Sequence, residues 1–376
     1  MAGINLVIAD NDEAYLDSFV SYMIRYYPHR FTVNTFSGIK DLRGYLEEVS
    51  DKVDILLISE DLEHDSVDKS KIGCFIILTK GKAARGEGEQ YCINKYQYGD
   101  RLAACILGVY SEKTGGKFNG ESKNKNTRVV SVFSPQGGSG KTSIALSACI
   151  QCARKGSMVF YLNLEEFNST SAFLNCKSDL NFSNVIYYLK ERSRNLALKI
   201  EASKCVDPVW GFHYFAPSDN DVEINEISFE DVNELIDQIK SLGIYDFIFI
   251  DMSSSFNARN TGLLGISDRI LLVFGMEMSS ESKIARFVDS LDIFVQKGQE
   301  DIRGKCGVIL NRCRQSVQSY SDYESIFDNA NPVKIPEIKD FNWSEIPYLT
   351  NMDNGNGENI GRLIQGYDLA VQSKCI

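Results

Sequence analysis

The segment Val129–Ser143, VVSVFSPQGGSGKTS, decides how this chain is expected to fold. It begins with an apolar run that suits a buried parallel strand, and the helical pattern IALSACIQCARKG follows its glycine-rich loop. Glycines allow backbone N–H groups to converge on phosphate oxygens, and the N-terminus of the next helix adds partial positive charge. Strand, loop and helix in this order predict a phosphate-binding loop. Because Pro135 replaces the first glycine of the general pattern, a simple glycine turn before a helix is the alternative interpretation.

The polar residues of this segment have expected chemical roles. Lys141 supplies a cation for the β- and γ-phosphates of a nucleotide, and the Thr142 hydroxyl is placed to bind Mg²⁺. Further along the chain, the apolar run YDFIFIDMSSS delivers Asp251 at the end of a strand. A carboxylate there can act in the second coordination sphere of the same ion. The predicted metal residues are therefore Thr142 and Asp251, and Mg²⁺ is a predicted cofactor.

The length of 376 residues suits two domains that each bury a core. A polar stretch without periodicity, SEKTGGKFNGESKNKNT, separates the two halves and is typical of a linker. We expect an N-terminal domain at 1–111, a linker at 112–127 and a second domain at 128–376. Strand-like runs alternate with helical patterns in both halves, which predicts the α/β class with two doubly wound parallel sheets.

Composition narrows the possible functions. A net charge of −11 argues against non-specific binding to nucleic acid, which needs a basic surface. No apolar run is long enough to span a bilayer, so stable membrane insertion is not expected, and the N-terminus does not resemble a signal peptide. Ten scattered cysteines fit free thiols of a reducing compartment. We therefore expect a cytoplasmic protein.

The N-terminal half resembles a response-regulator receiver domain. Receivers carry an acidic pair after the first strand, matched by Asp10 and Asp12, and a threonine and a lysine after the fourth and fifth strands, matched by Thr79 and Lys95. The third strand should end in a phosphate-accepting aspartate, and Ser59 stands there instead. The resemblance thus implies a receiver fold that cannot form the usual acyl phosphate and that serves for docking.

The second half resembles the MinD/ParA group of P-loop ATPases. The resemblance lies in the paired glycines of the loop, the acidic motif in FYLNLEEFNS, a strand ending in Ile-Asp and a late LNR. A receiver-like domain ahead of such an ATPase is the arrangement of the TadZ/CpaE family of pilus-assembly proteins. The resemblance implies ATP as the ligand, Asn311 as the reader of adenine, the segment at Ile346 wrapped around the base, and a homodimer that sandwiches ATP. It assigns ATP binding to Gly137, Gly138, Ser139, Gly140, Lys141, Thr142, Ser143, Asn311, Arg312, Ile346 and Pro347.

Three departures from the MinD/ParA pattern bear on hydrolysis. Gln136 stands where the group has a lysine that crosses to the partner's phosphates, and it brings no charge. Glu165 stands where an aspartate orients the attacking water, and its extra methylene displaces the carboxylate. Ser253 replaces a proline after Asp251. The candidate catalytic residues are Glu165, Asp251 and Gln136, and we expect a P-loop ATPase by fold with slow or absent hydrolysis.

Two functions follow from this combination. The first is an ATP-bound dimeric scaffold that marks a cell site, such as a pole or the inner face of the membrane, and recruits pilus or secretion machinery. The alternative is a cycling partition ATPase that positions cargo on DNA or membrane. A phosphorylation-controlled output protein is a third and weaker interpretation, because Ser59 occupies the acceptor position.

Overall fold

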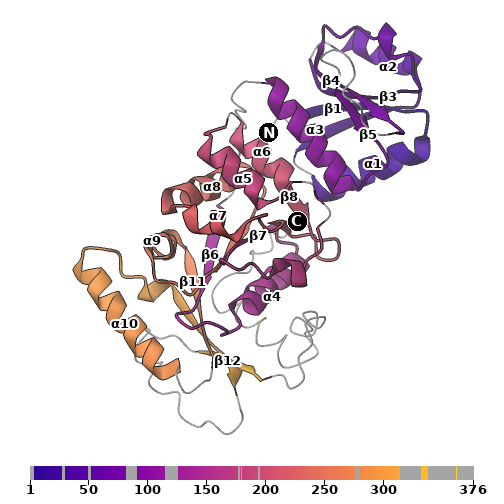
Figure 1. Ribbon diagram of the computed structural model, residues 1–376. Coiled ribbons are helices and arrows are strands. Elements are labelled where there is room, and N and C mark those ends of the chain that lie inside the picture. The colour runs from indigo at the N-terminus through magenta and orange to yellow at the C-terminus, as the bar shows by residue number, and fades with distance from the viewer. Residues whose placement is uncertain are drawn as a thin grey trace. The chain divides into compact units, whose positions relative to one another are not determined.

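The computed structural model describes residues 4–27, 30–49, 52–81, 91–114, 126–176, 178, 180–193, 195–275, 280–313, 332–337 and 361. Two units make up the chain (Figure 1). The first contains residues 1–123 and 177–206, and the second contains residues 124–176 and 207–376.

The first unit is built on a five-stranded sheet with the order β2-β1-β3-β4-β5, and every neighbouring pair is parallel. The strands are β1 (Ile4–Ala9), β2 (Phe31–Phe36), β3 (Val53–Ser59), β4 (Ile72–Thr79) and β5 (Tyr91–Asn94). This is the flavodoxin-like order of a doubly wound sheet, and it places the ends of β1, β3 and β5 at one edge. The expected parallel α/β architecture is confirmed, while the receiver relationship stays a prediction.

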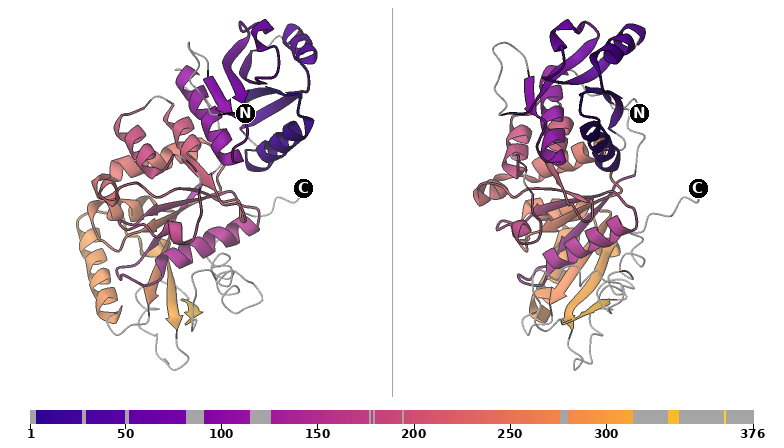
Figure 2. Two further views of the ribbon diagram at one scale, coloured as in Figure 1. Left: turned by 45° about the vertical axis from the view of Figure 1, so that its right-hand side comes forward. Right: turned by 90° about the vertical axis from the view of Figure 1, so that its right-hand side faces the viewer.

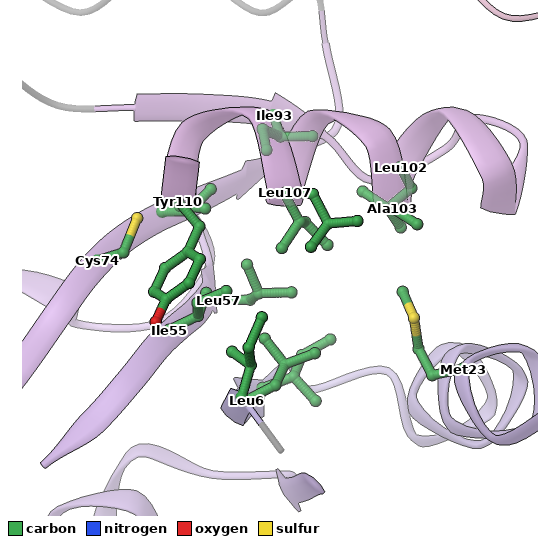
Figure 3. Packing of buried hydrophobic residues seen from close by; sticks show 14 of the residues in the cluster. Leu6, Met23, Ile55, Leu57, Cys74, Ile93, Leu102, Ala103, Leu107 and Tyr110 are labelled. Carbon is green, nitrogen blue, oxygen red and sulfur yellow. The ribbon is translucent and has the colours of Figure 1, made fainter. Parts of the chain in front are cut away.

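Helices cover both faces of this sheet. They are α1 (Glu13–Tyr26), α2 (Ile39–Glu48) and α3 (Gly99–Thr114), with a short 3₁₀ turn η1 (His64–Ser66). The Asp12 side chain caps α1 by accepting a hydrogen bond from the Tyr15 N–H, so part of the predicted acidic pair begins a helix. Figure 3 shows side chains of α1 and α3 meeting those of the strands in one buried cluster, which includes Leu6, Met23, Leu57, Ile93 and Leu107. Residues of α2 pack in a second cluster that includes Leu42 and Leu46.

A segment from the second half of the chain completes the first unit. It contains α5 (Phe182–Lys190), α6 (Leu196–Ser203) and β8 (Lys204–Val206), which the expected boundaries placed in the nucleotide-binding domain. Helix α6 packs against α3 and adds Leu198 and Ala202 to the core of the first unit. The buried carboxylate of Glu201 pairs with Arg30 at 2.6 Å and with Lys204 at 3.5 Å. Apolar burial and this ion cluster explain why the domain is not a single stretch of sequence.

The cysteines differ in part from the expectation. Cys176 and Cys205 are disulfide-bonded. Seven others among the described residues form no disulfide, and of these Cys149 and Cys152 are fully buried. The expectation that all thiols are free was therefore wrong for two of them.

The second unit contains a larger parallel sheet, whose strands within the unit follow the order β13-β12-β11-β6-β10-β7-β9. These strands are β6 (Arg128–Phe133), β7 (Val159–Leu164), β9 (His213–Phe215), β10 (Phe247–Met252), β11 (Arg269–Gly275), β12 (Cys306–Cys313) and β13 (Val333–Pro336). Strand β6 lies between β10 and β11, so the glycine loop that follows it emerges at the centre of the sheet edge. Residues at the ends of β10, β11 and β7 lie close to that loop for the same reason.

The helices of the second unit are α4 (Lys141–Arg154), α7 (Asp221–Glu226), α8 (Phe229–Ser241), α9 (Ala258–Ile266) and α10 (Ser280–Gln296), with 3₁₀ turns η2 (Thr170–Ala172) and η3 (Arg303–Lys305). Helix α4 packs against β6, β7 and β10, and its magenta ribbon runs along the sheet in both views of Figure 2. Helix α8 buries an apolar stripe of Val232, Leu235, Ile236 and Ile239, and a capping box of Ser228 and Asp231 begins it. Within the described parts of the chain, no helix combines the length and apolarity needed to cross a membrane.

Candidate nucleotide-binding site

The loop between β6 and α4 has the geometry of a phosphate cradle. Gly138 and Gly140 adopt left-handed backbone conformations with φ of 71° and 92°, which glycine adopts without strain. A Cβ atom at Gly140 would overlap Nδ2 of Asn311, whereas a Cβ at Gly137 or Gly138 would meet nothing within 4 Å. Helix α4 starts directly after the loop at Lys141, so its free N–H groups face the same place. The predicted strand–loop–helix arrangement is confirmed.

Lys141 and Thr142 lie where the sequence places them, at the start of α4, and both contact polar groups that follow the ends of β7 and β10. The ammonium of Lys141 donates a hydrogen bond to Oγ of Ser254 at 3.0 Å and lies 3.6 Å from Oε1 of Glu165. The Thr142 hydroxyl donates to Oε2 of Glu165 at 3.1 Å. The structure therefore brings the cation, the hydroxyl and the carboxylate of the prediction into one cluster. Ser143 follows in the first turn of α4.

Asp251 lies beneath this cluster at the end of β10 and is fully buried. The phenol of Tyr161 donates a hydrogen bond to its Oδ2 at 2.9 Å. Burial raises the pKa of Asp251 to about 7, and the nearby charge of Glu165 adds to this increase. A carboxylate that is costly to ionise in the free protein is a suitable neighbour for a divalent cation, because the cation would favour its charged form.

Two buried polar atoms at this site have no hydrogen-bond partner among the described residues. They are Oγ of Ser139, in the loop, and Oδ1 of Asp251. Unpaired buried polar atoms are rare in folded proteins and are explained where a ligand or ion completes them. The residues present thus fit a magnesium-bound nucleotide, with Lys141 and the loop N–H groups on the phosphates and Thr142 and Asp251 on the Mg²⁺ side. The ion would neutralise phosphate charge there.

Comparison with known proteins agrees with this geometry. Residues 127–303 match a family model described as an AAA domain. The ParA family ATPase from Chlorobium tepidum TLS is 18% identical, with 65% of this chain and 100% of that chain covered and a TM-score of 0.51. A chain of the MinC:MinD cell division protein complex of Aquifex aeolicus is 19% identical, with 64% and 96% covered and a TM-score of 0.50. The fold is that of the ParA and MinD ATPases.

The septum site-determining protein MinD of Pyrococcus horikoshii OT3, solved with Mg-ADP, is 17% identical, with 64% of this chain and 96% of that chain covered and a TM-score of 0.45. No curated protein matched the chain.

In this ParA/MinD-type domain, the side chain of Gln136 is turned inward. It is 1% exposed, and its Oε1 accepts a hydrogen bond at 3.3 Å from the Gly275 N–H at the end of β11. Its backbone carbonyl accepts another from Oγ of Ser254 at 3.1 Å. The resemblance assigned this position to a side chain that reaches a partner subunit, and the glutamine instead joins its own loop to β11. A catalytic role for Gln136 stays a prediction.

Asn311 and Arg312 lie at the end of β12, beside the loop. Nδ2 of Asn311 donates a hydrogen bond to the Ser139 carbonyl at 2.8 Å, and its Oδ1 accepts one from the Arg312 N–H. The Asn311 side chain therefore holds the phosphate loop to β12 through a hydrogen bond. Its expected recognition of adenine stays a prediction. Arg312 is exposed and has a φ of 60°. Ile346 and Pro347 lie outside the described residues.

The sequence analysis missed two residues of this site. Ser254 lies within the SSS run after Asp251, and its hydroxyl connects Lys141 to the loop. A hydroxyl three residues after a strand-ending aspartate was the available signal. Tyr161 lies two residues before Asn163 on β7, and strand alternation places both on one face, where Asn163 donates to the Tyr161 hydroxyl at 3.2 Å.

Proposed function

We propose that this chain binds ATP with Mg²⁺ at the loop of its ParA/MinD-type domain and holds it, acting as a nucleotide-bound positioning factor. The observation that carries the proposal is the pair of unpaired buried atoms, Oγ of Ser139 and Oδ1 of Asp251, beside Lys141 and Thr142. The choice of ATP is supported by the fold, because the Chlorobium tepidum protein of the same fold is an ATPase of the ParA family.

Slow or absent hydrolysis is part of this proposal. A cation that reaches the transferred phosphate from another subunit is worth a factor of about 10³ to 10⁵ in rate. Gln136 carries no charge and is buried against β11, so it does not supply such a cation. The Glu165 carboxylate is the remaining candidate to orient water, and it lies against Thr142 and Lys141. A domain with these features favours retention of ATP over turnover.

The cellular role in this proposal is a dimeric scaffold of the TadZ/CpaE type, in which ATP lies between two copies and pilus or secretion proteins are recruited. The N-terminal unit supports a docking role because Ser59, at the expected acceptor position, is fully buried and carries no carboxylate. A cycling partition ATPase is the second candidate, and it is favoured by the position of the Glu165 carboxylate beside the magnesium-binding hydroxyl of Thr142.

Parallel measurements of ATP binding and hydrolysis test the proposal. Isothermal titration with ATP and Mg²⁺ should show binding by the natural protein and none by Lys141→Met. Phosphate release should be far below the median enzyme turnover of about 10 per second. Sedimentation with and without ATP should show whether the nucleotide promotes a dimer. Turnover near that median would favour the cycling ATPase, and no binding of ATP would contradict both functions.

A further inference from the structure

We infer that Glu165 acts as a latch that blocks the nucleotide site of the free protein. Its carboxylate contacts the Lys141 ammonium and the Thr142 hydroxyl, which are the groups that would receive the nucleotide. The carboxylate must therefore be displaced when phosphate enters. This inference rests on the proposed function and adds a control of nucleotide entry to it. It assigns Glu165 a role in the nucleotide-free protein that differs from orientation of water during hydrolysis.

The contacts of Glu165 use both of its oxygens. Oε2 accepts the hydrogen bond of the Thr142 hydroxyl at 3.1 Å, and Oε1 lies 3.6 Å from the Lys141 ammonium. The side chain of Lys141 is 6% exposed and that of Glu165 is 21% exposed, so water screens this pair only partly. One carboxylate therefore engages the two side chains that a magnesium nucleotide needs.

Phosphate and the Glu165 carboxylate compete for the same groups. Both are anions, so a phosphate placed on the Lys141 ammonium would lie beside the Glu165 carboxylate, and the two would repel each other in this partly buried site. Lys141 keeps a second partner in Ser254 at 3.0 Å, so it stays in place when Glu165 leaves. If nucleotide binds only when Glu165 has left Lys141, the apparent affinity equals the intrinsic affinity multiplied by the fraction of molecules in that state.

The loop that carries Glu165 is anchored at both ends. Its backbone N–H donates to Oδ1 of Asn163 at 2.8 Å, and Nδ2 of Asn163 donates to the Thr170 hydroxyl at 3.2 Å. Between these anchors the chain reaches the surface, where Phe167 is 82% exposed. The Glu165 side chain can consequently turn away from Lys141 without loss of the hydrogen bonds that hold the loop.

Three variants distinguish a direct contact of Glu165 with the nucleotide site from a general effect of negative charge on nucleotide binding. Glu165→Gln keeps the shape and removes the charge, Glu165→Asp keeps the charge and shortens the reach, and Glu166→Gln removes the same charge one residue away. Each protein is titrated with a fluorescent ATP analogue in EDTA, so that Mg²⁺ does not contribute.

We expect Glu165→Gln to bind the analogue about tenfold more tightly than the natural protein, the size expected when one partly buried charge pair need not be broken. Glu165→Asp should also bind more tightly, by a few fold, because its shorter carboxylate cannot contact both Thr142 and Lys141. Glu166→Gln should stay within about twofold of the natural protein, because Lys141 and Thr142 pair with Glu165 and not with Glu166 among the described contacts.

Distinct results would overturn the inference. Unchanged or weaker binding of the analogue by Glu165→Gln would show that the Glu165 carboxylate does not compete with phosphate. If Glu165→Asp bound the analogue with the affinity of the natural protein, the charge and not the contact would be responsible. An equal gain in Glu166→Gln leads to the same conclusion. If none of the proteins binds the analogue, with or without Mg²⁺, the proposed function itself fails, which the first two results would not show.

Discussion

The two parallel sheets of this protein differ in the buried polar groups that lie where their strands end. At the edge of the first unit, Lys95 donates to Oδ2 of Asp10 at 2.7 Å, and the two residues are 2% and 1% exposed. At the edge of the second unit, Lys141 lies beside a loop of left-handed glycines, and buried oxygens of Ser139 and Asp251 lack hydrogen-bond partners among the described residues. Each lysine contacts a carboxylate, but Lys95 and Asp10 are both buried, whereas the Glu165 side chain beside Lys141 is 21% exposed.

This difference is the one we expect if the first edge contributes to stability and the second binds the proposed ligand. In a buried ion pair the two charged groups satisfy each other, so neither Lys95 nor Asp10 is left for a ligand. Unpaired buried oxygens reduce the stability of the free protein and are satisfied when a ligand supplies the missing contacts. The expectation that the N-terminal unit has lost phosphoryl chemistry rests on Ser59 and stays a prediction.

The largest expected effect is a loss of stability when the buried pair of Lys95 and Asp10 in the first unit is broken. Lys95→Met leaves the Asp10 carboxylate buried without its cation, and such a loss costs about 3–5 kcal/mol. Urea denaturation should show this loss of stability. Lys80→Met, which removes an exposed lysine that pairs with Asp61, is the control and should change stability little. Equal stability of the Lys95 variant and the natural protein would contradict a structural role for this edge.

The corresponding substitution at the sheet edge of the second unit should affect ATP binding more than stability. Lys141→Met should weaken ATP binding by at least about 100-fold, since a charged contact to phosphate is worth about 3 kcal/mol. Its stability should fall less than that of Lys95→Met, because Glu165 is partly exposed and can be solvated. Titration calorimetry and urea denaturation of both variants test the comparison. If Lys95→Met lost ATP binding while staying folded, the assignment of the site would be wrong.

A smaller effect is expected for the glycine loop. Gly140→Ala forces a left-handed conformation that costs an ordinary residue about 1–2 kcal/mol, and its Cβ would overlap the Asn311 amide. ATP binding should weaken by roughly tenfold. Gly156→Ala is the matched control, since Gly156 is also left-handed, with a φ of 85°, lies outside the loop, and has nothing within 4 Å of its Cβ position. Equal affinities of the two variants would show that the loop geometry does not control binding.

The smallest effect concerns pH. The pKa of Asp251 is raised from 3.8 to about 7 in the folded protein, mainly by burial. Between these values the folded state holds a proton that the unfolded state has released, so stability without nucleotide should fall as pH rises through this window. Melting temperatures of the natural protein and Asp251→Asn between pH 4.5 and 7.5 measure it. The variant should lose part of the slope, and parallel curves would refute the raised pKa.

Much of the second unit could be predicted from local sequence. The strand β6, the glycine loop and the start of α4 lie within one short segment, and their chemistry depends on residues next to one another. The same holds for the buried stripe of α8 and for Asp251 at the end of β10. Apolar periodicity and strand ends determine these features without reference to distant parts of the chain.

Sequence by itself thus determined the α/β class, the parallel sheets and the position of the phosphate loop. Tertiary structure decided the rest: α6 joins the first unit through Glu201 and Arg30, Gln136 turns toward Gly275, and Glu165 occupies Thr142 and Lys141. Each of these contacts joins residues that are far apart in the chain or whose side chains had several possible partners. Periodicity carries no information on such choices, because they depend on which polar groups are buried together when the sheets and helices pack.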